Sequence, residues 1–401
     1  MKLRILKVSM NHNRVLISAL FYLLAFVFLD QLFWLMLPAL FFLISALVHG
    51  SSWRQGFIWG VVVYGGHLGI LYYALAMIRP SWWLIALWGC TTLYLTAHVV
   101  VLFFVCAQLH EKLRSKTARL CCVLALVCFC FWWIDRKALW VFDAEGGYCL
   151  ANPLLPLVHG WCQMSDCESK EHAPAWIDQL GIVRLPSRPG QDVDPVESVR
   201  EFFGKVAHAR SVKPKMVCCI TPESSLPFPL NKHKKVMDVI SDNCSGLALF
   251  IGSFYDDGLF VHNGHYWFVE GKLQKFIGKQ HVMPLVEKMP RWCNWQKLRL
   301  LFLGNGKECC VDGQRREALE LLPGRYFYPI ICSELFCTNM LKNVPRGAVA
   351  LVLVNDAWFG ATILPQLLWL YALMQAWWYR VPMLYVSQVS TQYKTRTLRV
   401  K

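Results

Sequence analysis

Long apolar stretches fill the first third of the chain, and short polar segments separate them. A stretch of about 18 apolar residues is long enough to cross the roughly 30 Å hydrocarbon core of a bilayer. The pattern predicts membrane-spanning helices at residues 15–28, 32–48, 56–77, 83–109 and 120–133. Tryptophan pairs at 82–83 and 132–133 stand at the ends of these predicted spans, where aromatic rings favour the membrane interface.

From residue 178 the pattern changes to short apolar runs that alternate with amphipathic segments. These runs predict strands at 180–185, 216–220, 247–253, 265–269, 326–331 and 349–354, and helices at 196–209 and 234–242. Strands alternating with helices are typical of a layered α/β domain. We therefore expect a membrane domain of about five transmembrane helices at 1–135, a connector at 136–177 and an α/β domain at 178–401.

Basic residues near the predicted spans indicate an orientation. They precede the first span and recur between the second and third and between the fourth and fifth. Cytoplasmic loops of membrane proteins carry the excess of Lys and Arg. With five spans, this rule predicts that everything after Trp133 lies on the outer side of the membrane.

Composition agrees with a membrane protein and argues against two other classes. Of the 401 residues, 56% are hydrophobic, and the mean hydropathy is +0.36. The net charge of +15 comes from scattered Lys and Arg rather than a basic patch, which argues against nucleic-acid binding. The 17 cysteines form no paired C-x-x-C motif, so no metal site is expected. Neighbouring residues on a strand face opposite sides, so Cys218 and Cys219 cannot easily join one cluster. The sequence does not pair any cysteines in disulfides.

Three polar residues near the ends of apolar runs could carry chemistry. Cys332 follows a predicted strand and opens a helix-like stretch, an elbow that exposes a thiol and is expected to lower its pKa. Glu223 follows another strand and could act as a general base, and Lys279 could stabilise an oxyanion. Taken singly, each has an ordinary alternative: a buried apolar cysteine, a turn acid and a solvated lysine.

The motifs around these residues resemble those of the bacterial apolipoprotein N-acyltransferases, in the nitrilase superfamily, over roughly residues 15–395. The matching positions are Pro222-Glu223 with Pro227; Lys279, Pro284 and Glu287 at K-x-x-x-x-P-x-x-E spacing; Ile331-Cys332-x-Glu334; Asn355-Asp356-Ala357-Trp358-Phe359-Gly360 with Gln366; and Gly56-Phe57-x-x-Gly60 in the third predicted span. The resemblance implies a multi-span helical membrane domain followed by an αββα sandwich.

The same resemblance implies an activity and its residues. Glu223 is expected as base, Lys279 at the oxyanion and Cys332 as nucleophile, supported by Glu287, Glu334 and Asn263. These would move an acyl chain from a phospholipid, through a Cys thioester, to the terminal amine of a lipoprotein or to another amine. No cofactor is implied. The expected location is the bacterial inner membrane, with the catalytic domain on the periplasmic side.

The sequence also departs from the family. Ser333 stands where an aromatic residue usually follows the nucleophile, and the signatures after Gln366 are absent. Neither the final strands nor a carboxy-terminal membrane helix is recognised before Lys401, so the chain resembles a form shortened at this end. Two alternatives stay open: a membrane-tethered amidase of the nitrilase type, and a non-catalytic accessory of a conjugation or secretion apparatus.

Overall fold

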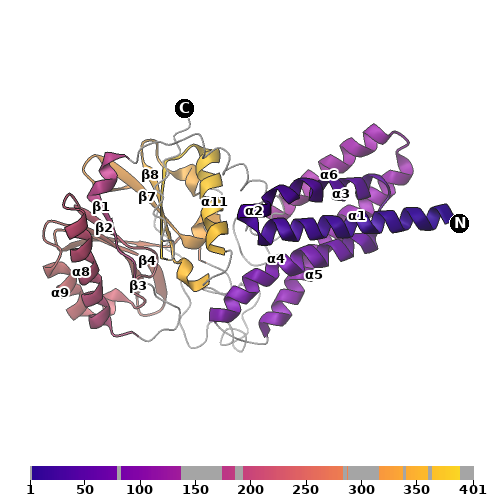
Figure 1. Ribbon diagram of the computed structural model, residues 1–401. Helices are drawn as coiled ribbons and strands as arrows, with labels where there is room; N and C mark the ends of the chain where they lie inside the picture. Colours follow the sequence, from indigo (N-terminus) through magenta and orange to yellow (C-terminus); the bar gives the residue numbers. More distant parts are fainter. Residues whose placement is uncertain are drawn as a thin grey trace. The chain divides into compact units, whose positions relative to one another are not determined.

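A computed structural model describes residues 2–78, 83–136, 174–185, 193–282, 287, 316–336, 340–359 and 364–388. These residues group into two compact units. The helical unit contains the helices before residue 137 and residues 364–370. The α/β unit contains the strands and residues 371–388 (Figure 1).

The helical unit is built from long helices joined by short turns. Its elements are α1 (Lys2–Val27), α2 (Leu29–Leu32), η1 (Phe33–Leu35), α3 (Met36–Val48), α4 (Trp53–Ile78), α5 (Trp83–Lys112) and α6 (Lys116–Arg136). Every predicted span is therefore helical. Among the described residues, Leu84–Lys112 and Lys116–Ile134 are long and apolar enough to cross a membrane, and His12–Val27 and Met36–Val48 are shorter apolar helices.

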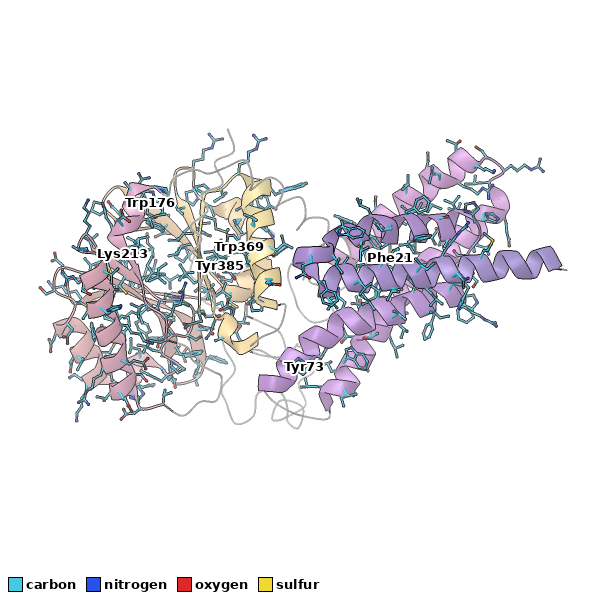
Figure 2. All side chains as sticks on the ribbon, in the orientation of Figure 1. Phe21, Tyr73, Trp176, Lys213, Trp369 and Tyr385 are labelled. Atoms are coloured by element: carbon cyan, nitrogen blue, oxygen red, sulfur yellow. The ribbon has the colours of Figure 1, made fainter. Side chains whose placement is uncertain are left out.

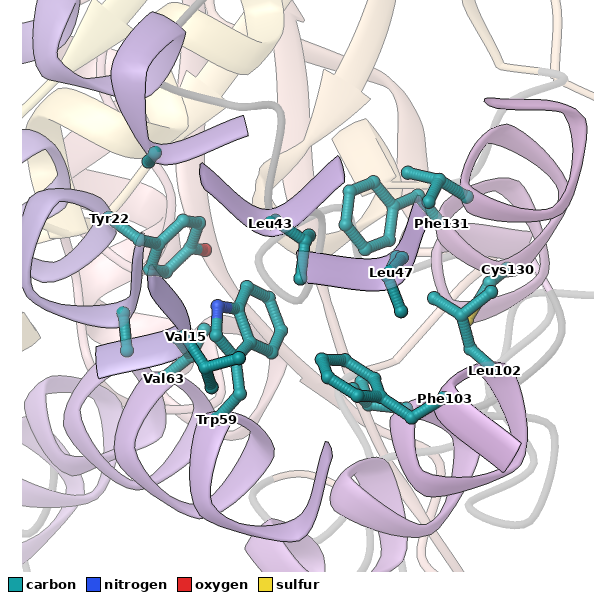
Figure 3. Close-up of a cluster of buried hydrophobic side chains, with 14 of the residues drawn as sticks. Val15, Tyr22, Leu43, Leu47, Trp59, Val63, Leu102, Phe103, Cys130 and Phe131 are labelled. Atoms are coloured by element: carbon teal, nitrogen blue, oxygen red, sulfur yellow. The ribbon is translucent and has the colours of Figure 1, made fainter. Parts of the chain in front are cut away.

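Large side chains from α1, α3, α4, α5 and α6 share one core, seen in Figure 3 around Trp59, Tyr22 and Phe103. Helix α4 lies close to α5 because Gly60 has no side chain: a Cβ there would lie 2.7 Å from the Thr96 methyl group. A chain of buried hydrogen bonds links α1, α3 and α4. Trp59 Nε1 donates to Ser18 Oγ (3.0 Å), which donates to Ala39 O (2.8 Å).

Two sheets form the α/β unit. The first has the order β1-β2-β3-β4-β5, from β1 (Leu180–Ile182), β2 (Cys218–Ile220), β3 (Ala248–Asp256), β4 (Val261–Val269) and β5 (Lys272–Gly278). The second has the order β6-β7-β8-β9, from β6 (Leu319–Leu322), β7 (Arg325–Ile331), β8 (Val349–Val354) and β9 (Met383–Ser387). Strands β1–β3 are parallel, as are β7–β9, while β3-β4-β5 and β6-β7 pair antiparallel.

The sheets and helices are layered. Helices α8 (Pro195–Val212) and α9 (Lys234–Asp242) cover one face of the first sheet through Phe202 and Ile240. The other face packs on the second sheet, where Phe250 and Leu351 share a core with Trp176, labelled in Figure 2. In helix α11 (Leu364–Tyr379), the Gln375 side chain donates to Leu335 O at 3.5 Å.

The structure confirms the layered α/β arrangement and corrects several details. Cys218 lies between the sheets and Cys219 under the helices, as expected for neighbouring strand residues. The sequence analysis missed β5, β6, α11 and β9. Strand β9 pairs in parallel with β8, and the expected shortening beyond it concerns residues outside the described ones.

Gly252 in β3 provides a test of how tightly the first sheet holds the segment after β2. A Cβ at this position would lie 2.2 Å from Pro222 O and 2.9 Å from Ser224 N, which are backbone atoms that cannot rotate away. Gly252→Ala is expected to lower the free energy of unfolding of the α/β unit by about 1–3 kcal/mol.

The matched control is Gly204→Ala, on the exposed side of α8 with no atom near the new methyl group. It should raise stability by about 0.5–1 kcal/mol, because alanine favours helix more than glycine does. Chemical denaturation of both variants measures the difference. Equal stabilities would mean that the segment around Pro222 is not held against β3.

Candidate active site

Cys332 stands at a sharp turn directly after β7. Its φ of +44° lies in the left-handed region, which costs a non-glycine residue about 1–2 kcal/mol, and it opens the 3₁₀ helix η6 (Cys332–Phe336). The turn is held on both sides: Ile331 N donates to Glu334 Oε2 (2.7 Å), and Ser333 Oγ donates to His281 O (2.8 Å). The elbow expected from the sequence is present, and the strained conformation fixes the thiol at the end of the strand.

Lys279 follows β5 and lies fully inside the unit, with 2% of its side chain exposed. Its Nζ donates to Glu223 Oε1 (2.9 Å) and to both carboxylate oxygens of Glu287 (3.0 and 2.9 Å). Asn263 of β4 donates Nδ2 to the same two carboxylates, at 2.9 and 2.8 Å. One ammonium and one amide therefore hold two buried carboxylates together.

Glu223 also faces the second sheet. Its Oε2 accepts from Asn355 N at 3.3 Å, just after β8, and its carboxylate forms a hydrogen bond with the Cys332 side chain. Glu223 and Lys279 come from the first sheet, and Cys332 comes from the second. The two sheets thus bring the three residues to one place.

The pKa of the Cys332 thiol is shifted in the direction opposite to the one predicted from the sequence. Burial, and then the Glu223 carboxylate, raises the pKa of Cys332 well above its usual value, although Lys279 offsets part of this rise. The predicted lowered pKa is therefore wrong. Burial alone would lower the pKa of Lys279, but Glu223 and Glu287 outweigh it and raise that pKa well above its usual value. At neutral pH the lysine is charged and the thiol is protonated.

Glu334 lies behind the thiol and pairs with Arg316, a residue that was not predicted from the sequence. Arg316 binds both of its carboxylate oxygens, through Nη1 and, at 2.8 Å, through Nη2. The same guanidinium donates to Gly278 O (2.7 Å) and to Pro329 O (3.0 Å). Arg316 belongs to the charged run Gln-Arg-Arg-Glu, which reads as a solvated loop, so no local signal marks it.

All six residues predicted from the sequence take part in this cluster or lie directly behind it. Glu223, Lys279, Glu287 and Asn263 are bonded to each other, Cys332 bonds to Glu223, and Glu334 holds the turn that carries Cys332. Among the described residues, no group of three or more His, Cys, Asp or Glu side chains could hold a metal ion. The Lys279 ammonium occupies the position between the carboxylates.

The arrangement can perform nucleophilic acyl chemistry. A buried thiol that is protonated at rest needs a base, and Glu223 is in hydrogen-bond contact with it. A fixed positive charge nearby can stabilise negative charge on an attacked carbonyl oxygen.

The chain is similar to curated apolipoprotein N-acyltransferases. It is 27% identical to that of Brucella suis over 209 residues, covering 47% of this chain and 39% of the relative. It is 25% identical to that of Allorhizobium ampelinum over 159 residues, covering 37% and 30%. The chain thus spans about two fifths or less of the length of these relatives. No family model matches it.

The similarity of this chain to solved structures is weaker than its similarity to these sequences. Nit3 of Saccharomyces cerevisiae, described as a member of branch 10 of the nitrilase superfamily, aligns with a TM-score of 0.37 and 15% identity. The alignment covers 54% of this chain and 78% of that protein.

The raised pKa of Cys332 gives a pH test. Only the thiolate reacts with iodoacetamide, so alkylation of Cys332 should be slow at pH 7 and accelerate about tenfold per pH unit, with no plateau below about pH 9. Mass spectrometry of the peptide containing residue 332 measures the rate, and Cys332→Ser identifies the background. A plateau below pH 8 would show that the thiolate is stabilised after all.

Proposed function

We propose that this protein is a membrane-bound N-acyltransferase that works through a thioester on Cys332. Similarity to the apolipoprotein N-acyltransferases supports acyl transfer as the reaction class. The observation that carries the proposal is the buried Glu223–Lys279 ion pair (2.9 Å) in contact with a thiol at a strained elbow.

In the first half-reaction Glu223 accepts the proton of the Cys332 thiol while the sulfur attacks the carbonyl carbon of a phospholipid ester. The carbon–oxygen bond of the ester then breaks, the departing lysophospholipid oxygen takes the proton from Glu223, and a thioester remains on Cys332. The base is needed because the thiol is protonated at rest.

In the second half-reaction a neutral amine attacks the thioester. Glu223 removes one proton from the amine nitrogen, the carbon–sulfur bond breaks, and the proton passes to the sulfur. The products are an amide and the free thiol. Because both halves use one site, the kinetics are expected to be ping-pong. The amino terminus of a lipoprotein is the proposed acceptor.

Lys279 stabilises the oxyanion in each half-reaction mainly through its charge. Its three N–H groups already contact carboxylate oxygens, two of them on Glu287. It can therefore act over a short distance, or release one Glu287 oxygen and donate directly. Glu223 and Glu287 keep the ammonium charged, and Asn263 holds the two carboxylates in place.

The lipid donor requires a site at a membrane. The apolar helices support membrane attachment, and the five-span arrangement, with the catalytic unit on the periplasmic side of the inner membrane, is our proposal for its topology. Basic residues in the first half of α1, Arg54 in the first turn of α4, and the basic residues around the turn between α5 and α6 support this orientation.

A trapping experiment tests the chemistry. Purified protein incubated with a radiolabelled phospholipid and no amine should gain a hydroxylamine-sensitive adduct on Cys332. Cys332→Ser should form no such thioester, while Cys90→Ser, at an exposed cysteine of the helical unit, should react like the wild type. Glu223→Gln should slow adduct formation because the base is lost, and Lys279→Met should slow it about 10²–10³-fold.

Each variant should first be checked for folding by thermal denaturation, because Lys279→Met leaves two buried carboxylates unpaired. A folded wild type that hydrolyses the lipid ester but never transfers to an added lipopeptide amine would favour the tethered hydrolase. Absence of any adduct together with an intact lipid ester would remove the enzyme proposal.

Topology is tested separately by reporter fusions. Alkaline phosphatase fused after residue 175 should be active, because this enzyme folds only outside the cytoplasm. Green fluorescent protein fused at the same position and exported by the same route should stay dark. The reverse pattern would place the catalytic unit in the cytoplasm.

A further inference from the structure

Lys279 and Cys332 belong to different sheets, so their distance depends on how the sheets are held at this end. Lys279 follows β5 of the first sheet, and Cys332 follows β7 of the second. A single buried ion pair, Arg316 with Glu334, contacts the backbone on both sides. Its side chains are 1% and 0% exposed.

Glu334 reaches both strand ends with its two oxygens. Oε1 accepts the backbone N–H of Gln280, the residue after Lys279. Oε2 accepts the N–H of Ile331, the residue before Cys332, at 2.7 Å. One carboxylate therefore fixes the peptide next to the ammonium and the peptide next to the thiol.

Arg316 completes the connection from the other direction. Nη2 donates to Gly278 O, the residue before Lys279, at 2.7 Å, and Nη1 donates to Pro329 O of β7 at 3.0 Å. Arg316 and Glu334 together therefore bind the backbone on both sides of Lys279, and the same ion pair binds the backbone just before Cys332.

We propose that Arg316 is a positioning residue, which through Glu334 sets the distance between the Lys279 ammonium and the Cys332 thiol. This role rests on the proposed function for its effect on catalysis, but the geometry it controls exists without substrate. The guanidinium touches neither the thiol nor the lysine side chain in any described contact; it acts through the backbone on either side of them.

Arginine is suited to this role and lysine is not. A guanidinium offers five N–H groups in a fixed plane, so it can bind both oxygens of Glu334 and two carbonyls at once. A lysine ammonium has three donors on a flexible stem and cannot span these partners. Because buried ion pairs add little net stability, the benefit of this pair lies in the geometry it fixes.

The first test replaces Arg316 with lysine, which keeps the charge. Arg316→Lys should slow formation of the Cys332 thioester roughly 10- to 100-fold, since small displacements of a catalytic group have effects of this size. The control Arg325→Lys, an exposed arginine at the opposite end of β7, should react at the wild-type rate.

Loss of stability alone must be separated from loss of position. Phe202→Leu lies in the core between α8 and the first sheet, away from the thiol, and serves as a destabilised reference. At a temperature well below the melting temperatures of both variants, Phe202→Leu should form the thioester at the wild-type rate, while Arg316→Lys should form it more slowly. If Arg316→Lys does not fold, Glu334→Asp, which shortens the carboxylate side of the pair, takes its place.

A second readout needs no lipid. Lys279 offsets part of the rise in the Cys332 pKa, so moving the ammonium away should shift the pH profile of Cys332 alkylation to higher pH. The shift is expected in Arg316→Lys and absent in Arg325→Lys and Phe202→Leu.

These outcomes separate the two proposals. A pH shift in Arg316→Lys, in a protein whose wild type forms no thioester, would support the positioning role and refute acyl transfer. An unchanged alkylation profile together with an unchanged thioester rate would overturn the positioning role. So would a slower thioester rate that is matched by Phe202→Leu.

Discussion

The buried ammonium of Lys279 between two carboxylates is the interaction on which the rest of the α/β unit depends. Removing three charges from water is costly, and each must find partners inside. Lys279, Glu223 and Glu287 satisfy one another, and Asn263 donates to one oxygen of each carboxylate. The second oxygen of Glu223 accepts the backbone N–H of Asn355. Burial, followed by the nearby Glu223 carboxylate, raises the pKa of the neighbouring Cys332 thiol, so the thiol keeps its proton.

The sheet topology places these residues close together at the ends of strands. Glu223 follows the parallel strand β2, Asn263 lies near the start of β4 and Lys279 follows β5, so one end of the strands of the first sheet carries all three residues. The ends of β7 and β8 contribute Cys332 and the Asn355 N–H from the second sheet. The chemistry is therefore assembled by the packing of two sheet faces.

Much of this could be predicted from the sequence, because the relevant signals are local. Cys332 and Glu223 each end an apolar run, and the helices at 195–212 and 234–242 and the strand at 349–354 were predicted to within three residues at each end. Strand β5 was missed because two adjacent polar residues, Gln274-Lys275, and two adjacent apolar residues, Phe276-Ile277, break the alternation. Arg316 could not be found, since its partners, the Glu334 carboxylate and the carbonyls of Gly278 and Pro329, lie outside any local sequence pattern. The direction in which the Cys332 pKa shifts also depends on burial and on the Glu223 carboxylate, which lies 109 positions earlier in the chain. No local sequence pattern reports either cause.

The division of the site between two sheets has a consequence for biosynthesis. A chain grows from its amino terminus, so β1 to β5, with Glu223, Asn263 and Lys279, leave the ribosome before β7 exists. The nascent protein carries the proposed base and cation while it still lacks the proposed nucleophile. The strained turn at Cys332 can persist only when its surroundings hold it, and these include Gln280 and His281, beyond the first sheet's last strand. A partly made or partly folded molecule therefore has no aligned thiol, and the proposed reactivity toward acyl esters would arise only when the second sheet docks.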